Sequence, residues 1–182
     1  MNNFSNKGVA KGVVFTTTRL EAHFLTPKNQ NLLEELYQKG QTSQHLKGLD
    51  AAKDIALTQA CYQENNNVGA YLIFHGDSKE FIGFGGIHNQ EPLKDGTLAL
   101  EDAIEFLIMI DENHAGKGYA KEFSAAFLDF FFKNFPQKTL PARVSKDNIA
   151  CINLLERLGF AHEGETVYYD RENKFYLLRK NL

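Results

Sequence analysis

The sequence has 182 residues, of which 43% are hydrophobic and 24% are charged, and its formal net charge is −3. These values are typical of one globular domain, and they argue against a nucleic-acid-binding protein, which normally has a basic surface. No apolar run is as long as a membrane span, and the first residues lack the apolar core of a secretion signal. We therefore expect a cytoplasmic protein without a membrane or nucleic-acid partner, with a flexible tail over residues 1–12 and a single domain over residues 13–182.

The first part of the chain reads as a strand followed by two helices. Val13 to Leu25 is rich in β-formers and predicts one strand. Thr26 is a helix-capping residue with Pro27 behind it, at the first helical position. Asp50 caps a second predicted helix, which ends near residue 63.

Two β-rich runs, residues 68–74 and 80–88, flank a polar turn and predict a hairpin. The second run contains Gly83, Gly85 and Gly86. Glycine weakens the interior of a strand, so three of them indicate a close approach by backbone or ligand, or alternatively a bulged and twisted strand.

The longest patterned stretch begins at Ile104 and ends at Phe135. Apolar residues alternate along residues 104–110, which predicts a strand buried on both faces. After Gly116 and Gly118 the apolar residues take helical spacing. A helix that begins behind a glycine turn presents unpaired N–H groups and the positive end of its dipole, which predicts an anion site. The alternative is a glycine turn that only leads into a core helix.

The last part of the chain predicts a short strand at residues 140–145, a short helix, and a terminal hairpin after Ala161. The order of elements gives an α/β fold with a mixed, mostly antiparallel central sheet flanked by helices, and not a doubly wound one. Cys61 and Cys151 both fall in predicted helices, so no disulfide framework is expected. We predict no metal site.

The glycine turn is the first of three motifs that are similar to those of one family. Residues 113–118, NHAGKG, resemble the pyrophosphate-binding loop [QR]-x-x-G-x-[GA] of the GNAT superfamily of acetyl-CoA-dependent N-acetyltransferases, with Asn113 in place of Gln or Arg. The next residues, 119–122 (YAKE), resemble the continuation of this loop in the ribosomal-protein N-terminal acetyltransferase branch.

The other two motifs lie at opposite ends of the chain. Residues 145–160, SKDNIACINLLERLGF, resemble the segment N-x-x-S-x-x-x-L-E-K-L-G-F of that branch, with Cys151 and Arg157 in place of Ser and Lys. Residues 18–20, TRL, resemble the opening of its first strand. The three motifs occur in the family's order and span about residues 16 to 180.

The resemblance implies a GNAT-like acyl-CoA N-acyltransferase fold whose central strands are splayed around acetyl-CoA. The cofactor's amides would pair with the main chain of residues 107–110, and its pyrophosphate would bind N–H groups of residues 114–120. Asn148 would contact the pantetheine arm; a helix cap is its alternative role. The implied cofactor-binding residues are Leu107, Ile108, Met109, Ile110, His114, Ala115, Gly116, Lys117, Gly118, Tyr119, Ala120 and Asn148.

Acetyl transfer to an amine requires a base, because an alkylamine is mostly protonated at neutral pH. Glu105 is the candidate, since it is the lone charge in an apolar strand; a carboxylate paired with a structural partner is the alternative. His88 is the second candidate, against a structural or exposed histidine. A backbone N–H near Met109 would stabilise the oxyanion. Leu155 stands where many superfamily members have the Tyr acid, so the general acid is unassigned.

We expect an enzyme that transfers acetyl from acetyl-CoA to a primary amine by direct attack in a ternary complex. The acceptor is either a protein N-terminal α-amine or a small-molecule amine. The alternative is a catalytically silent acyl-CoA-binding module used for sensing or assembly. A homodimer is compatible with the sequence.

Overall fold

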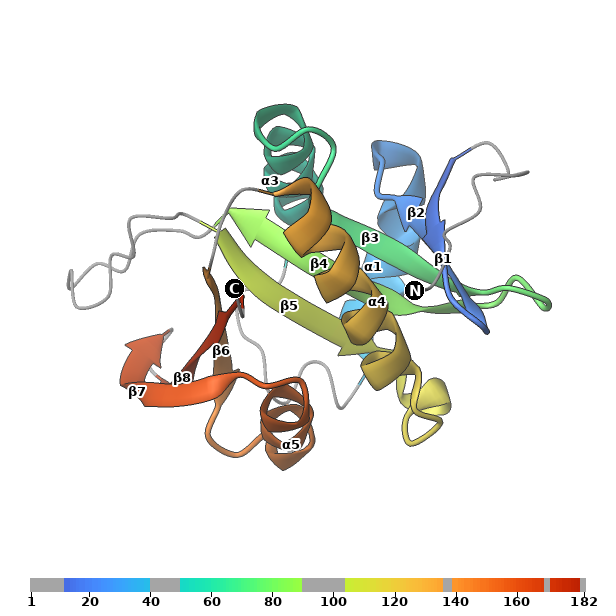
Figure 1. Cartoon of the computed structure of the whole chain (residues 1–182). Helices are drawn as coiled ribbons and strands as arrows, with labels where there is room; N and C mark the ends of the chain where they lie inside the picture. The colour runs from blue at the N-terminus through green and yellow to red at the C-terminus, as the bar shows by residue number, and fades with distance from the viewer. Residues whose placement is uncertain (1–11, 40–49, 90–103, 136–138, 169–170, 181–182) are drawn as a thin grey trace.

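A computed structural model of the protein describes residues 12–39, 50–89, 104–135, 139–168 and 171–180 (Figure 1). The elements are β1 (Val13–Thr16), β2 (Leu20–Phe24), the 3₁₀ turn η1 (Pro27–Asn29), α1 (Gln30–Gln38), α3 (Ala51–Glu64), β3 (Ala70–His75), β4 (Phe81–Asn89), β5 (Ile104–Ile110), the 3₁₀ turn η2 (Glu112–His114), α4 (Tyr119–Asn134), β6 (Thr139–Ser145), α5 (Ile149–Arg157), β7 (Ala161–Tyr168) and β8 (Arg171–Arg179). Apart from residue 12, the predicted tail lies outside the described residues.

The strands form two separate antiparallel sheets. One has the order β1-β2-β3-β4-β5 and the other β6-β8-β7. Edge strand β5 lies next to edge strand β6, yet the two belong to different sheets. The predicted mixed α/β fold with splayed central strands is therefore confirmed.

Helices cover both faces of the five-stranded sheet (Figure 1). Helix α4 packs Phe123 and Phe127 against one face, in the same buried cluster as Tyr71. Helices α1 and α3 pack on the opposite face, where Leu36 and Leu72 share the second buried cluster. Tyr71 and Leu72 are neighbours in β3, so strand alternation alone sends them to opposite sides.

The single strand predicted over residues 13–25 is wrong, because the chain reverses at residues 17–19 to form β1 and β2. The Thr17 hydroxyl accepts a hydrogen bond from the Leu20 N–H at 3.0 Å, and the Thr17 N–H donates to the Leu20 carbonyl at 2.9 Å. Threonine is a β-former, so composition could not reveal this turn.

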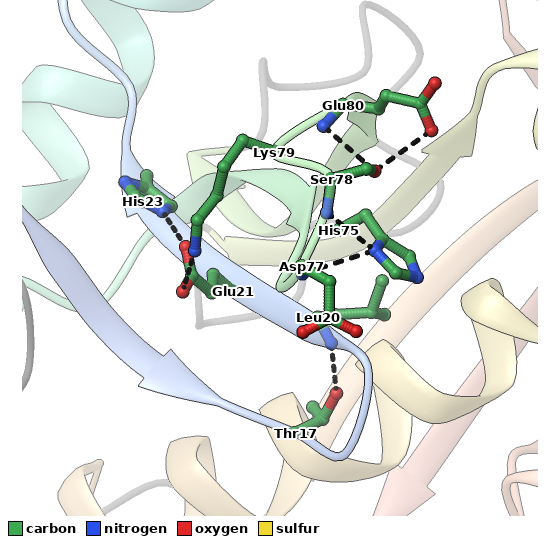
Figure 2. A network of polar contacts seen from close by, with 9 residues as sticks. All are labelled: Thr17, Leu20, Glu21, His23, His75, Asp77, Ser78, Lys79 and Glu80. Carbon is green, nitrogen blue, oxygen red and sulfur yellow. Dashed lines mark hydrogen bonds and ion pairs between the residues drawn. The ribbon is translucent and has the colours of Figure 1, made fainter.

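The predicted β3–β4 hairpin is confirmed, and Figure 2 shows the polar contacts of its turn. Lys79 donates to Glu21 of β2 at 2.6 Å, and Glu21 also contacts His23 at 3.1 Å. The Asp77 and Ser78 N–H groups point to the His75 ring nitrogen, each at 3.3 Å. These contacts fix the hairpin tip on β2, at the sheet end near the β1–β2 turn.

Close approach by neighbouring side chains and backbone explains Gly85 and Gly86 of β4. A Cβ on Gly85 would lie 2.6 Å from the Ile108 side chain and 3.0 Å from that of Phe123. A Cβ on Gly86 would lie 2.3 Å from the Gly69 carbonyl oxygen. The missing side chains therefore let β4 pack closely between its neighbours and beneath α4.

The predicted helix start at Asp50 is confirmed, because its carboxylate accepts from the Lys53 N–H at 3.0 Å. Thr26 and Pro27 begin the 3₁₀ turn η1, and α1 follows it with Asn29 as its N-cap. Both Cys61 and Cys151 are free thiols. None of the helices in the described ranges has the length and apolarity needed to cross a membrane.

Candidate functional site

A cleft of about 850 Å³ opens where β5 and β6 diverge. Its walls come from elements that are far apart in the sequence: β5, the loop before α4, β6, α5 and α3. Most of the predicted site residues line it: Glu105, Leu107, Ile108, Met109, Ile110, His114, Ala115, Gly116, Gly118, Tyr119, Ala120 and Asn148. Lys117 is the predicted residue that is not part of the lining.

The glycine loop at one end of the cleft has the geometry of an anion site. Gly116 and Gly118 have φ angles of 74° and 80°, which favour glycine, and Gly118 is the N-cap of α4. The first N–H to bond within the helix is that of Glu122, which donates to the Gly118 carbonyl at 3.1 Å. The N–H groups of residues 119–121 precede this bond, so they form the open end of the helix.

Two of the predicted phosphate donors are already used. The His114 N–H donates to the Asp111 carbonyl at 2.8 Å, and the Ala115 N–H donates to the Glu112 carbonyl at 3.2 Å. These bonds close η2, which precedes the glycine loop. The N–H groups of His114 and Ala115 are therefore not available to an anion.

Arg19, from the first-strand motif, braces this loop. Its guanidinium donates to the Lys117 carbonyl at 3.1 Å and lies 4.5 Å from the centre of the Tyr119 ring. It also forms an ion pair with Glu122 at 2.7 Å, and Glu122 accepts from the Thr17 hydroxyl at 2.6 Å. The first-strand motif and the YAKE motif therefore hold each other in place, a role that neither motif revealed in the sequence.

A second ion pair fixes the start of the loop. Lys39, just after α1, contacts the Asp111 carboxylate, which also accepts from the Asn113 N–H at 2.9 Å. Burial raises the pKa of Asp111, but the hydrogen bonds from Lys39 and Asn113 outweigh this effect and leave that pKa below its usual value. The C-terminal end of α1, on the far face of the sheet, is thus tied to the start of η2 before the glycine loop.

Strand β5 forms the floor of the cleft. Among the described strands, it pairs only with β4. Residues 104–106 are buried, as the alternating pattern predicts, whereas residues 107–110 are only half-buried. Residues 107–110 line the cleft, so the exposed part of these residues faces the cleft.

Helix α5 supplies the facing wall. The Asn148 side chain accepts from the Cys151 N–H at 3.1 Å, so Asn148 is a helix cap. Burial raises the pKa of the Cys151 thiol to about 12, so the thiol form predominates at neutral pH. Leu155 is buried and offers no proton.

At the other end of the cleft, Glu105 is 4% exposed and paired with Arg143. Its Oε2 accepts from Arg143 Nη2 at 2.7 Å, and its Oε1 accepts from the Arg143 backbone N–H at 2.7 Å. His88 lies opposite Glu105 in the β4–β5 register, with its Nε2 4.0 Å from the carboxylate. The Glu105 carboxylate thus has a structural partner, Arg143, which was the alternative to its role as a base. The two candidate bases, Glu105 and His88, lie close together.

The wall of the cleft formed by α1 and α3 also carries a cluster of three polar side chains that the sequence did not indicate. The Tyr37 hydroxyl donates to the Asp54 carboxylate at 2.7 Å. Thr58 follows one turn later, and all three residues line the cleft. Burial raises the pKa of Asp54, partly offset by the Tyr37 hydrogen bond and by the charge of His88. A polar residue on an amphipathic helix resembles a surface residue, so only the fold reveals this group.

The residues that the structure describes contain no cluster of three or more side chains that could hold a metal ion.

Several solved structures share this fold at low sequence identity. An acetyltransferase from Agrobacterium tumefaciens is 22% identical with a TM-score of 0.76, covering 97% of this chain and 99% of its own. RimL, a ribosomal L7/L12 α-N-protein acetyltransferase in complex with coenzyme A, is 18% identical with a TM-score of 0.72. The match covers 92% of this chain and 98% of RimL. A spermidine N-acetyltransferase chimera from Vibrio cholerae and hSSAT is 19% identical with a TM-score of 0.66, covering 89% and 96%. No curated protein matches the chain.

The family model of the GNAT acetyltransferase domain matches residues 20–161, which is most of the chain. This stretch includes the glycine loop, the splayed strands β5 and β6, and the motif helix α5. A catalytically silent module is therefore not favoured. The chain belongs to the GNAT acetyltransferase family, and it is an acetyl-CoA-dependent N-acetyltransferase.

Proposed function

We propose that this protein acetylates a primary amine in a ternary complex with acetyl-CoA, with a protein N-terminal α-amine as the first candidate acceptor. The observation that carries the proposal is the cleft between β5 and β6, which has an anion-binding loop at one end and ionisable side chains at the other. RimL, which shares the fold, is named as an α-N-protein acetyltransferase. A small amine is the second candidate, because a spermidine N-acetyltransferase also shares the fold.

The cleft suits acetyl-CoA in shape and in donor groups. Nothing lies within 4 Å of a Cβ built on Gly116, so a phosphate has room to approach the loop backbone. The half-buried main chain of β5 is free on one edge among the described strands, which suits pairing with the pantetheine amides. On the facing wall, the Asn148 oxygen caps α5, and we propose that its amide nitrogen contacts the pantetheine.

When bound, acetyl-CoA would supply a thioester whose carbonyl carbon is open to attack. The uncharged amine nitrogen would bond to this carbon, the carbon–sulfur bond would break, and coenzyme A would leave as its thiolate, which takes up a proton from water. We propose that the amine's proton passes to the pair of His88 and Glu105, where an imidazolium ion would be stabilised by the carboxylate 4.0 Å away. A β5 N–H near Met109 would stabilise the charge on the acetyl oxygen.

We also propose a cytoplasmic location, a single domain over residues 13–182 and a homodimer. The general acid stays unassigned, because Leu155 replaces the usual Tyr.

The test is to replace the proposed base pair. Glu105→Gln should slow thiol release from acetyl-CoA by about 10²- to 10⁴-fold with any accepted amine, without changing acetyl-CoA affinity. Glu163→Gln is the matched control, because it removes a carboxylate that is paired with Arg179 at 2.6 Å outside the cleft. His88→Gln provides a second variant if Glu105→Gln unfolds. Wild-type turnover in both Glu105→Gln and His88→Gln would show that this pair does not act as the base.

A further inference from the structure

The polar group on the α1–α3 wall lies at the amine end of the cleft. Asp54 and Thr58 are one helical turn apart on α3, so they lie on the same face of this helix. Both residues line the cleft together with His88 and Glu105. The charge of His88 acts on Asp54, so this wall lies near the proposed base pair.

Tyr37 holds the Asp54 carboxylate in position. The hydroxyl of Tyr37 donates to Asp54 at 2.7 Å, and Tyr37 is itself only 9% exposed. The surrounding cluster is apolar and includes Ile55 and Phe84. A buried hydrogen bond to a fixed donor restricts the rotamers of the carboxylate, which pre-organises it for a ligand.

Thr58 gives an independent sign of a ligand. It is 1% exposed, and its hydroxyl has no hydrogen-bond partner within the described parts of the chain. A buried hydroxyl without a partner is costly, so such a group in the lining of a cleft indicates that something else satisfies it.

We propose that Asp54, held by Tyr37 and followed by Thr58, is the subsite that binds the acceptor as a protonated primary amine before proton transfer. An ammonium group has three donors and one positive charge; the Asp54 carboxylate matches the charge and the Thr58 hydroxyl accepts a further donor. The charged groups that act on Asp54 are Asp50, Lys53 and His88. This inference rests on the proposed function.

The experiment measures amine binding separately from turnover. The full chain with coenzyme A is titrated with n-pentylamine by calorimetry, and pentan-1-ol serves as the uncharged probe. Asp54→Asn should weaken n-pentylamine binding about ten- to a hundredfold, because the charge-assisted bond is lost while the amide oxygen still accepts from Tyr37. Asp129→Asn, an exposed aspartate on α4, is the matched control and should leave binding unchanged.

Thr58→Val tests the hydroxyl, since it keeps the shape of the side chain. Amine binding should fall about two- to tenfold without loss of thermal stability. Equal n-pentylamine affinity in wild type and Asp54→Asn, or equal affinity for pentan-1-ol and n-pentylamine, would overturn the subsite. Amine binding that depends on Asp54, without thiol release from acetyl-CoA with either n-pentylamine or peptides that carry a free N-terminal amine, would instead overturn the proposed function and leave the subsite standing.

Discussion

Gly116 illustrates how one residue decides whether the loop binds an anion. Its φ of 74° and the open space around it allow a phosphate to reach the backbone. Gly116→Val should abolish acetyl-CoA binding, because a branched side chain fills the space that the phosphate needs. Calorimetric titration with acetyl-CoA is the measurement.

Gly12→Val is the control for the backbone strain of that variant. Gly12 also has a positive φ, 103°, with nothing within 4 Å of its Cβ, and it is not part of the cleft lining. Both variants should lose about 1–2 kcal/mol of stability, but only Gly116→Val should lose the cofactor. Wild-type acetyl-CoA affinity in Gly116→Val would contradict the placement of the pyrophosphate.

Single residues also mark how far the sequence predicts the site. Glu105 and His88 could be found because each is a polar residue in an apolar run. Arg143 could not be recognised as the partner of Glu105, since it comes 38 residues later in another sheet. The Tyr37–Asp54 bond joins two helices, and their relative packing is not encoded in any local pattern.

At the level of elements, the first turn of α4 is fastened to the β1–β2 turn by Glu122. Burial raises the pKa of Glu122, but its hydrogen bonds with Thr17 and Arg19 outweigh this and lower the pKa from its usual 4.5. A lowered folded-state pKa adds stability above the unfolded pKa, and this contribution disappears as the pH falls through the folded value.

Glu122→Gln should lower the free energy of unfolding by an amount that depends on pH. The variant should be less stable than wild type at about pH 7, and the difference should shrink at acidic pH, as the pH falls through the lowered pKa of the wild-type carboxylate. Urea unfolding at neutral and at acidic pH measures it, with Glu163→Gln as the surface comparison. A difference that stays constant with pH would show that the ion pair does not fasten the helix.

Helices and strands could be predicted where the spacing of apolar residues or a capping residue was clear. The alternation of β5, the cap at Asp50 and the glycine turn before α4 all correspond to observed features. The β1–β2 reversal was not predictable, because Thr17 supports a strand by propensity and a turn by its hydroxyl. Side-chain hydrogen bonds of this kind depend on which residue comes close after folding.

For the whole molecule, the two sheets meet at strands that are not paired with each other. Acetyl-CoA in the cleft would bridge β5 and α5, and so would stabilise the folded state. At about 100 times its dissociation constant it should add roughly 2.7 kcal/mol, which raises the melting temperature. Thermal unfolding with and without acetyl-CoA is the measurement.

Pantetheine is the control ligand, because it lacks the pyrophosphate and should give a much smaller shift at the same concentration. If millimolar acetyl-CoA leaves the melting temperature unchanged, the cleft does not bind the cofactor in the proposed way.

The edge of β5 has a consequence for handling the protein. Its residues 107–110, LIMI, are apolar and only half-buried, and among the described strands β5 is paired on one edge while β6 lies beside it without pairing. An apolar strand with a free edge is a template for pairing with other chains, which leads to aggregation. The substrate that covers this edge would therefore also act as a solubilising ligand, so preparations kept with coenzyme A should remain monodisperse for longer than those without it.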